Sequence, residues 1–208
     1  MDIYFLRHGE TDWNKEGRVQ GHTDIMLNLN GRKQIGQSAE VLADLPFDFE
    51  LIIASPLWRA RESAEIVAAR LESAKENIVE EPLLIERNFG EAEGMKVTEL
   101  VEKYSVVLSR FPLYQYPGSE SLEEILERGR SVFEKIVDSY GNKSNILVVA
   151  HGAILSAIIT AITNGKVAYF GEKSHFDPAS LYLIKYQNGE IGLARYCANE
   201  SAVVDITY

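Results

Sequence analysis

The chain has 208 residues, 46% of them hydrophobic, and its formal net charge at pH 7 is -10. This length and composition fit one globular domain, while the absence of a signal peptide and of any run near the roughly 18 apolar residues of a membrane span predicts a cytoplasmic protein. The acidic balance argues against nucleic-acid binding and requires that a local basic pocket attract any anionic substrate.

Three short apolar runs predict buried strands. Residues 3–6, 51–54 and 146–150 lack polar alternation, as do strands of a parallel sheet that is covered on both faces. Apolar side chains recur at helical spacing in four further segments, residues 35–42, 60–71, 122–140 and 155–162. Strands that alternate with helices predict an α/β fold, a three-layer α/β/α sandwich around a mostly parallel central sheet.

Helix-end signals predict several boundaries. Ser55 is the expected N-cap of the second helix, with Pro56 at its first position. Ser121 and Glu124 have the spacing of a capping box before the third helix. The fourth helix is expected to stop at residues 164–165, an Asn-Gly pair.

The later part of the chain departs from the strand-helix alternation twice. Residues 182–196 hold two strand-like runs joined by Asn188 and Gly189, which predicts a hairpin that adds an antiparallel edge to the sheet. Residues from about 91 to 118 combine a short helical pattern with several aromatic side chains, and we expect them to form a small inserted cap over one end of the sheet. No repeat or linker divides residues 1–208, so a single domain with this cap is predicted.

Charged side chains gather where the predicted strands end. Arg7 and His8 follow the first strand, Arg59 lies one turn into the helix after the second, and His151 follows the strand at 146–150. Ligands of open parallel sheets bind beyond the carboxyl ends of the strands. A lone histidine there would be structural and a lone arginine solvated, but four such residues in an acidic protein predict a phosphate or carboxylate site.

Motifs along nearly the whole chain carry a family resemblance. They are, in order, LRHGETDWN, QGHTDIMLN, SPLWRARESA, ERNFGEAEG, PGSESLEEILERGR and VVAHGAIL. The sequence resembles the histidine phosphatase superfamily, in the branch that contains cofactor-dependent phosphoglycerate mutases and small broad-specificity phosphatases. The triplet RHG alone would be a weak match, but its combination with the distant SPLWRA and second HG is specific.

The resemblance implies roles for these residues. His8 would be the nucleophile that takes the phosphoryl group as a phosphohistidine. Arg7 and Arg59 would bind the phosphoryl oxygens and, by like-charge repulsion, keep His8 unprotonated. His151 completes the catalytic group as a donor to the same oxygens. The residues implied to bind substrate are Arg7, Asn14, Gln20, Gly21, Arg59, Arg87 and His151.

The acid/base residue implied by the resemblance is Glu86, which lies three residues before an aromatic-Gly pair. It would protonate the leaving alkoxide and then activate water against the phosphohistidine. Glu91 and Glu93 lie close enough in the sequence to be mistaken for it.

No cofactor or metal is expected. Cys197 is the only cysteine, which excludes disulfides within the chain and multi-cysteine zinc sites, and the histidines lack a metal-ligand spacing such as HExxH. A cation would also compete with Arg7 and Arg59 for the same space. His22 and His175 are interpreted as surface or polar-contact residues, and His175 as a residue that could reach the mouth of the site.

Three functions are compatible with these residues. A metal-independent phosphatase that acts on a small phosphorylated metabolite is the first interpretation, and a cofactor-dependent phosphoglycerate mutase is the alternative, with Arg87 as a candidate ligand for the substrate carboxylate. A noncatalytic scaffold is disfavoured because every presumed catalytic residue is present. The substrate and the oligomeric state are not predicted.

The predicted cap favours the phosphatase. It is short for a mutase insertion, and its cationic residues are Lys96, Lys103 and Arg110. Its aromatic residues would either contact an apolar leaving group or form the cap's own small core, and they are Tyr104, Phe111, Tyr114 and Tyr116.

Overall fold

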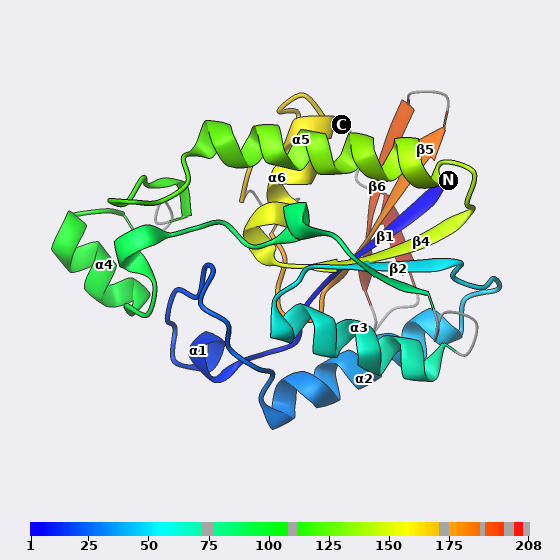
Figure 1. The fold of residues 1–208 in the computed structure, drawn as a ribbon, viewed down its shortest axis with the longest axis horizontal. Coiled ribbons are helices and arrows are strands. Elements are labelled where there is room, and N and C mark those ends of the chain that lie inside the picture. Colours follow the sequence, from blue (N-terminus) through cyan, green and yellow to red (C-terminus); the bar gives the residue numbers. More distant parts are fainter. Residues whose placement is uncertain (72–76, 108–111, 171–174, 188–189, 198–201, 206–208) are drawn as a thin grey trace.

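The computed structural model describes residues 1–71, 77–107, 112–170, 175–187, 190–197 and 202–205. Within them, a seven-stranded sheet lies between two layers of helices, in the strand order β3-β2-β4-β1-β5-β6-β7 (Figure 1). The strands are β1 (Asp2–Arg7), β2 (Leu51–Ala54), β3 (Ile78–Glu80), β4 (Asn145–Ala150), β5 (Leu181–Gln187), β6 (Glu190–Cys197) and β7 (Ala202–Asp205). The helices are α1 (Asp12–Lys15), α2 (Leu29–Ala43), α3 (Trp58–Arg70), α4 (Val97–Tyr104), α5 (Leu122–Tyr140) and α6 (Gly152–Ile162), with short 3₁₀ turns at Pro82–Leu84 and Gly90–Ala92.

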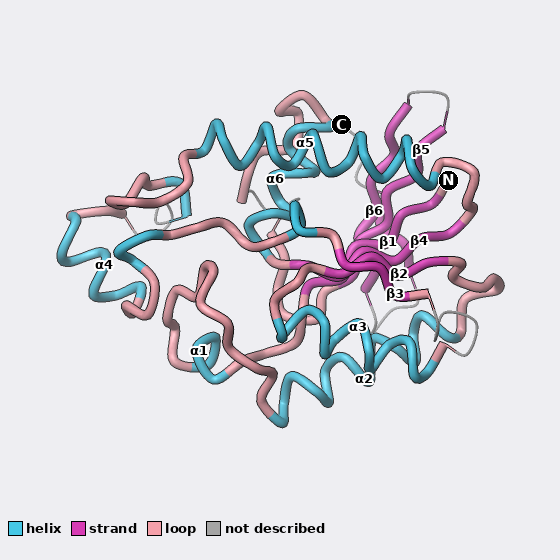
Figure 2. The backbone as a smooth tube through the Cα atoms, in the orientation of Figure 1, coloured by secondary structure: helices cyan, strands magenta, loops and turns pink. Residues whose placement is uncertain are grey.

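The strands alternate their side chains between two apolar cores. Ile3 and Phe5 of β1 pack in the core that contains α5 and α6, whereas Tyr4 and Leu6 pack with α2 and α3. Figure 2 shows the two helix pairs on opposite faces of the sheet. The three-layer α/β/α prediction is therefore confirmed.

The sheet has a parallel half and an antiparallel half. β4 lies between β1 and β2 and pairs parallel with both, and β3 pairs parallel with β2. The carboxyl ends of β1, β4 and β2 therefore lie along the same edge of the sheet. β5 runs antiparallel to β1 and pairs with β6, as the sequence predicts, although the turn at residues 188–189 lies outside the described residues. The antiparallel half extends one strand beyond the predicted hairpin, because β7 pairs with β6.

The helix after β2 begins later than the sequence predicts. α3 starts at Trp58, and its N-cap is Leu57 rather than Ser55. The Ser55 hydroxyl instead lies 2.7 Å from Nε2 of His151, and Asp24 of a distant loop accepts the Trp58 N–H at 2.8 Å. The N-cap prediction for Ser55 is wrong because contacts from elsewhere in the fold satisfy this end of α3.

The other predicted helix ends are confirmed. Ser121 and Glu124 form the capping box of α5, in which the Glu124 N–H donates to Ser121 Oγ at 3.1 Å. α6 ends just before Asn164 and Gly165, whose φ angles of 50° and 76° turn the chain out of the helix. In the described part of the chain, no helix is both long and apolar enough to cross a membrane.

The region predicted to form a cap is bonded to the loop that follows α1. The Val97 N–H donates to Gly17 O at 2.9 Å, and Val19 exchanges backbone hydrogen bonds with Gly94 and Met95 at 2.8 and 3.0 Å. α4 lies beyond the end of the sheet (Figure 1), and its Leu100 is fully buried in the core shared with α5 and α6. This shared core supports the proposal of one domain with a cap at about 91–118.

Two glycines of α2 provide a test of how the turn after β1 is packed. A Cβ on Gly31 would lie 2.1 Å from Glu10 O, whereas a Cβ on Gly36 would meet no atom within 4 Å. We expect Gly31→Ala to lower the free energy of unfolding by about 2 kcal/mol through overpacking. Gly36→Ala should raise it by about 0.5–1 kcal/mol because alanine favours the helix. Urea denaturation measures both, and equal effects would contradict the contact between α2 and residue 10.

Candidate active site

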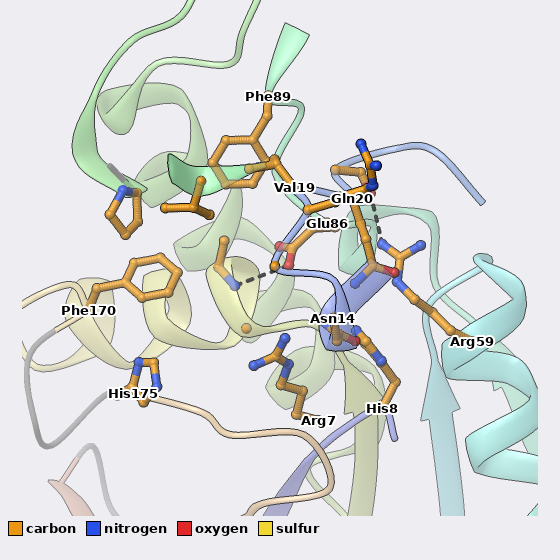
Figure 3. Close-up of a pocket in the computed structure, with 17 residues that line it drawn as sticks. Arg7, His8, Asn14, Val19, Gln20, Arg59, Glu86, Phe89, Phe170 and His175 are labelled. Carbon is orange, nitrogen blue, oxygen red and sulfur yellow. Dashed lines mark hydrogen bonds between the residues drawn. The ribbon is translucent and has the colours of Figure 1, made fainter. Parts of the chain in front are cut away.

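A pocket of about 450 Å³ opens at the carboxyl ends of β1 and β4 (Figure 3). Most of the sequence-predicted site residues line it, namely Arg7, His8, Asn14, Gln20, Gly21, Arg59 and Glu86. His151 lies directly behind these residues, with its ring centroid 5.1 Å from that of His8. The strand order thus brings together residues that are far apart in the sequence. Two predicted site residues do not line the pocket: His151, which packs against His8 and Arg59, and Arg87.

His8 is almost completely buried, and its ring is held by a short local contact. Nδ1 lies 2.7 Å from Gly9 O, and since a carbonyl oxygen only accepts, Nδ1 carries the proton of the neutral ring. Burial, with the charges of Arg59 and Arg7, lowers the pKa of His8 well below its ordinary value. The ring is therefore neutral at pH 7, and its unprotonated nitrogen is Nε2.

One fully buried and one partly buried arginine, Arg59 and Arg7, flank the nucleophile candidate. Arg59 donates to Gly21 O at 2.8 Å and to Thr23 O at 2.9 Å, which fixes the orientation of its planar head. Burial lowers the pKa of Arg59 to about 10, so this side chain stays charged at neutral pH. Arg7 donates to Phe176 O through Nη1, while its buried Nε has no hydrogen-bond partner among the described residues. These cations form an anion site inside an acidic protein.

His151 contacts Arg59 rather than the open pocket. Its Nδ1 accepts from Arg59 Nε at 3.2 Å, and its Nε2 lies 2.7 Å from the Ser55 hydroxyl. Burial, with the nearby charge of Arg59, lowers the pKa of His151 well below its ordinary value, so the ring is neutral and can accept. In this arrangement His151 orients Arg59, which differs from the direct phosphate donor that the sequence suggests.

Glu86 lines the pocket from the segment after the 3₁₀ turn at Pro82–Leu84, and its carboxylate faces the first turn of α6 (Figure 3). Its carboxylate accepts the N–H groups of Ala153 at 3.3 Å and Ile154 at 3.2 Å, so it caps this helix from outside. The two other glutamates considered from the sequence are elsewhere: Glu91 is exposed, and Glu93 is bonded to other backbone groups. Only Glu86 of the three lines the pocket.

Asn14 and Gln20 are arranged by Thr11. The Thr11 N–H donates to Asn14 Oδ1 at 3.1 Å, and the Thr11 hydroxyl donates to Gln20 Oε1 at 2.9 Å. With both side-chain oxygens engaged, the amide NH₂ groups are the parts that remain to donate into the pocket. Their position agrees with the substrate-binding role that the resemblance implies.

Arg87 is fully buried and points into the base of the cap. It donates to the carbonyl oxygens of Pro112, Tyr114 and Glu120, the last two at 3.3 and 2.8–2.9 Å. Its guanidinium carbon also lies 5.2 Å from the ring centroid of Phe89. Because these contacts occupy its donors, the expected role of Arg87 as a substrate carboxylate ligand is not supported by its position.

Sequence reasoning missed the apolar wall of the pocket. Five side chains from four separate segments form it, and they are Val19, Phe89, Val97, Pro112 and Phe170. They share no motif or spacing, so only the fold could bring them together. The cap aromatics Tyr104, Tyr114 and Tyr116 instead pack on one another, with ring centroids 4.9–5.8 Å apart, as the cap-core alternative predicts, while Phe111 and Arg110 lie outside the described residues.

The two remaining histidines are exposed, and one of them lines the pocket. His175 lines the pocket mouth with a half-exposed side chain and contacts Asp177 at 3.3 Å. His22 is exposed, and its Nε2 donates to the backbone oxygen of Glu86 at 2.8 Å, which agrees with a polar-contact residue. Among the described residues, no three His, Cys, Asp or Glu side chains are grouped closely enough to hold a metal ion.

Comparison with known proteins yields one family. A model of the Histidine phosphatase superfamily (branch 1) matches residues 3–199. The uncharacterized phosphatase PhoE of Bacillus subtilis is 39% identical over 163 residues, which cover 78% of each chain. The 2,3-bisphosphoglycerate-dependent phosphoglycerate mutase 2 of Gloeobacter violaceus is 32% identical over 162 residues, which cover 76% of this chain and 73% of the mutase. Among solved structures, YhfR of Bacillus stearothermophilus superposes with a TM-score of 0.79 and 26% identity, covering 91% of this chain and 93% of that one.

Proposed function

Since the chain belongs to branch 1 of the histidine phosphatase superfamily, whose members act as phosphatases or mutases, we propose that it is a metal-independent phosphatase. The substrate we propose is a small phosphomonoester with an apolar leaving group, hydrolysed through a phosphohistidine at His8. The similarity to a phosphatase of Bacillus subtilis supports the hydrolytic assignment.

One observation carries the proposal. A buried, neutral His8 lies between the charged Arg7 and Arg59, and the carboxylate of Glu86, which is bonded to the first turn of α6, lines the same pocket. Nucleophile, anion-binding cations and a carboxylate are the three groups that phosphoryl transfer through an enzyme nucleophile requires.

The proposed reaction has two steps. Nε2 of His8 forms a bond to phosphorus while the bond to the leaving oxygen breaks, and Glu86 in its protonated form donates its proton to that oxygen. Glu86, now a carboxylate, then takes a proton from water as the water oxygen attacks the phosphohistidine, which restores His8 and releases inorganic phosphate. Arg7 and Arg59 hold the phosphoryl oxygens throughout and stabilise the charge of both transition states.

The surroundings of the leaving group favour a phosphatase over a mutase. A mutase needs a cation for the carboxylate of its substrate, and Arg87 is bonded to cap carbonyls instead. Two basic residues line the described pocket away from the phosphate end, and each already contacts a carboxylate of the protein. Arg18 is paired with Glu16 at 2.6 Å, and His175 contacts Asp177 at 3.3 Å. An apolar wall that includes Phe89 suits an uncharged leaving group better than phosphoglycerate.

The proposal predicts phosphate release from several aryl and alkyl phosphomonoesters, with kcat/KM unchanged within about twofold by excess chelator. The physical reason is that arginines, not a metal, carry the positive charge at the phosphate. A colorimetric phosphate assay before and after incubation with EDTA measures this. Complete dependence on added metal would contradict the mechanism.

A second experiment distinguishes the proposed phosphatase from the mutase alternative. With 3-phosphoglycerate and a catalytic amount of the bisphosphate as substrates, we expect release of phosphate to be faster than formation of 2-phosphoglycerate. Phosphorus NMR distinguishes the products. Rapid formation of 2-phosphoglycerate would assign the protein to the mutases.

A further inference from the structure

Glu93 lies outside the pocket, yet four hydrogen bonds converge on its carboxylate. Oε1 accepts the N–H groups of His22 at 2.9 Å and Phe89 at 3.1 Å. Oε2 accepts the N–H of Thr23 at 3.0 Å and its hydroxyl at 2.8 Å. A single half-buried side chain thus joins the turn at residues 21–23 to the segment that carries Phe89.

The turn at residues 21–23 has a second partner on its other side. Its peptide N–H groups donate to Glu93, while its carbonyl oxygens at Gly21 and Thr23 accept from Arg59 at 2.8 and 2.9 Å. The Gly21–His22 peptide group is therefore polarised between a carboxylate, which accepts its N–H, and a guanidinium, which donates to its carbonyl, so each contact strengthens the other. Loss of the carboxylate would leave this turn, and with it the head of Arg59, less firmly held.

The local geometry shows that the turn and the carboxylate are matched. Gly21 has a φ of +56°, and a Cβ at this position would lie 2.0 Å from Glu93 Oε1. Any larger residue would displace the carboxylate as well as strain the backbone. The turn can approach Glu93 this closely only because residue 21 is glycine.

We propose that Glu93 is a positioning residue for the phosphoryl-transfer reaction, acting through the turn at residues 21–23 to hold Arg59 against the phosphoryl group. This inference rests on the proposed function, since it assigns Arg59 a phosphate-binding role. Glu93 itself touches no reacting atom. Its carboxylate also joins the turn to Phe89 of the apolar wall, so it ties the phosphate end of the pocket to the leaving-group end.

The test is a double-mutant cycle between Glu93 and Arg59. In Glu93→Gln, the amide NH₂ replaces one of the two acceptor oxygens, so at least one peptide N–H loses its acceptor. We expect kcat/KM to fall by about 10- to 100-fold, chiefly through kcat, when Arg59 is present. In an Arg59→Lys background, the same substitution should cost less than about threefold, because the fork that the turn orients is gone. Equal losses in both backgrounds would overturn the proposal.

Glu91→Gln is the matched control. Glu91 is exposed in the same short turn, and its substitution should change kcat/KM by less than about twofold in either background. Circular dichroism verifies that each variant is folded. If Glu93→Gln does not fold, Thr23→Val carries the test, because it keeps the shape of the side chain and removes only the hydroxyl that donates to Oε2.

Binding of orthovanadate, a mimic of the transferring phosphoryl group, separates this inference from the proposed function. Calorimetry should show that Glu93→Gln weakens vanadate binding by about tenfold when Arg59 is present and by less than about threefold in the Arg59→Lys background, whether or not turnover is seen. Coupled binding in a protein without phosphatase activity would refute the proposed function alone. If the protein is a phosphatase but the effects of the Glu93 and Arg59 substitutions on vanadate binding and on kcat/KM are independent, the role of Glu93 alone is refuted.

Discussion

Replacing His8 with alanine is expected to lower kcat/KM for phosphomonoesters by about four orders of magnitude or more, because the proposed nucleophile is removed. The variant should remain folded, because the substitution is made in the pocket and leaves both apolar cores unchanged. Steady-state kinetics and thermal unfolding of the variant measure the two effects. Retention of more than about one tenth of the activity would assign the nucleophile to another residue.

Phosphate labelling sharpens this test. The native protein, quenched during turnover of a ³²P-labelled phosphomonoester, should carry acid-labile label, and His8→Ala should carry none. His22→Gln is the control, because His22 is an exposed histidine outside the pocket and its loss should leave the labelling site intact. Label in the His8 variant would contradict the phosphohistidine proposal.

Replacing Glu86 with glutamine is expected to separate the two steps of the reaction. With alkyl phosphates, kcat/KM should fall by about 10²–10⁴-fold because the leaving oxygen receives no proton. A nitrophenyl leaving group needs little protonation, so the first step should persist while the second step, which requires a base, slows by a similar factor. Stopped-flow measurement of nitrophenol should then show a burst of about one equivalent per enzyme followed by slow turnover.

Glu91→Gln is the control for this experiment as well, since it removes a nearby carboxylate from the surface without touching the pocket. It should show neither a burst nor a slower steady state. Full activity of Glu86→Gln with alkyl phosphates would mean that another group supplies the proton.

The parts of the fold and site that are local in sequence could be predicted. The apolar runs that became β1, β2 and β4 each occupy consecutive residues, and Arg7, His8 and Arg59 follow them at short distances. General rules about parallel sheets then bring their ends together, which is why those residues were expected, and are found, around one pocket.

What could not be predicted depends on contacts between distant segments. The role of Arg87 depends on carbonyl oxygens more than twenty residues away, and no pattern in its own motif distinguishes a buried anchor from a substrate ligand. The start of α3 depends on Asp24, which accepts the Trp58 N–H, and on His151, which contacts the Ser55 hydroxyl. β7 contains only three consecutive apolar residues, between Ser201 and Asp205, a shorter run than those that became β1, β2 and β4.

The manner in which Arg87 holds the cap has a consequence for divergence within the family. Its partners in the cap are all main-chain oxygens, which every amino acid possesses. Pro112 illustrates this, because its carbonyl accepts from Arg87 while its ring lines the pocket. Substitution at such a position can therefore change the shape of the pocket wall while the attachment is kept, so the proposed leaving-group site can change without any change in the proposed catalytic residues.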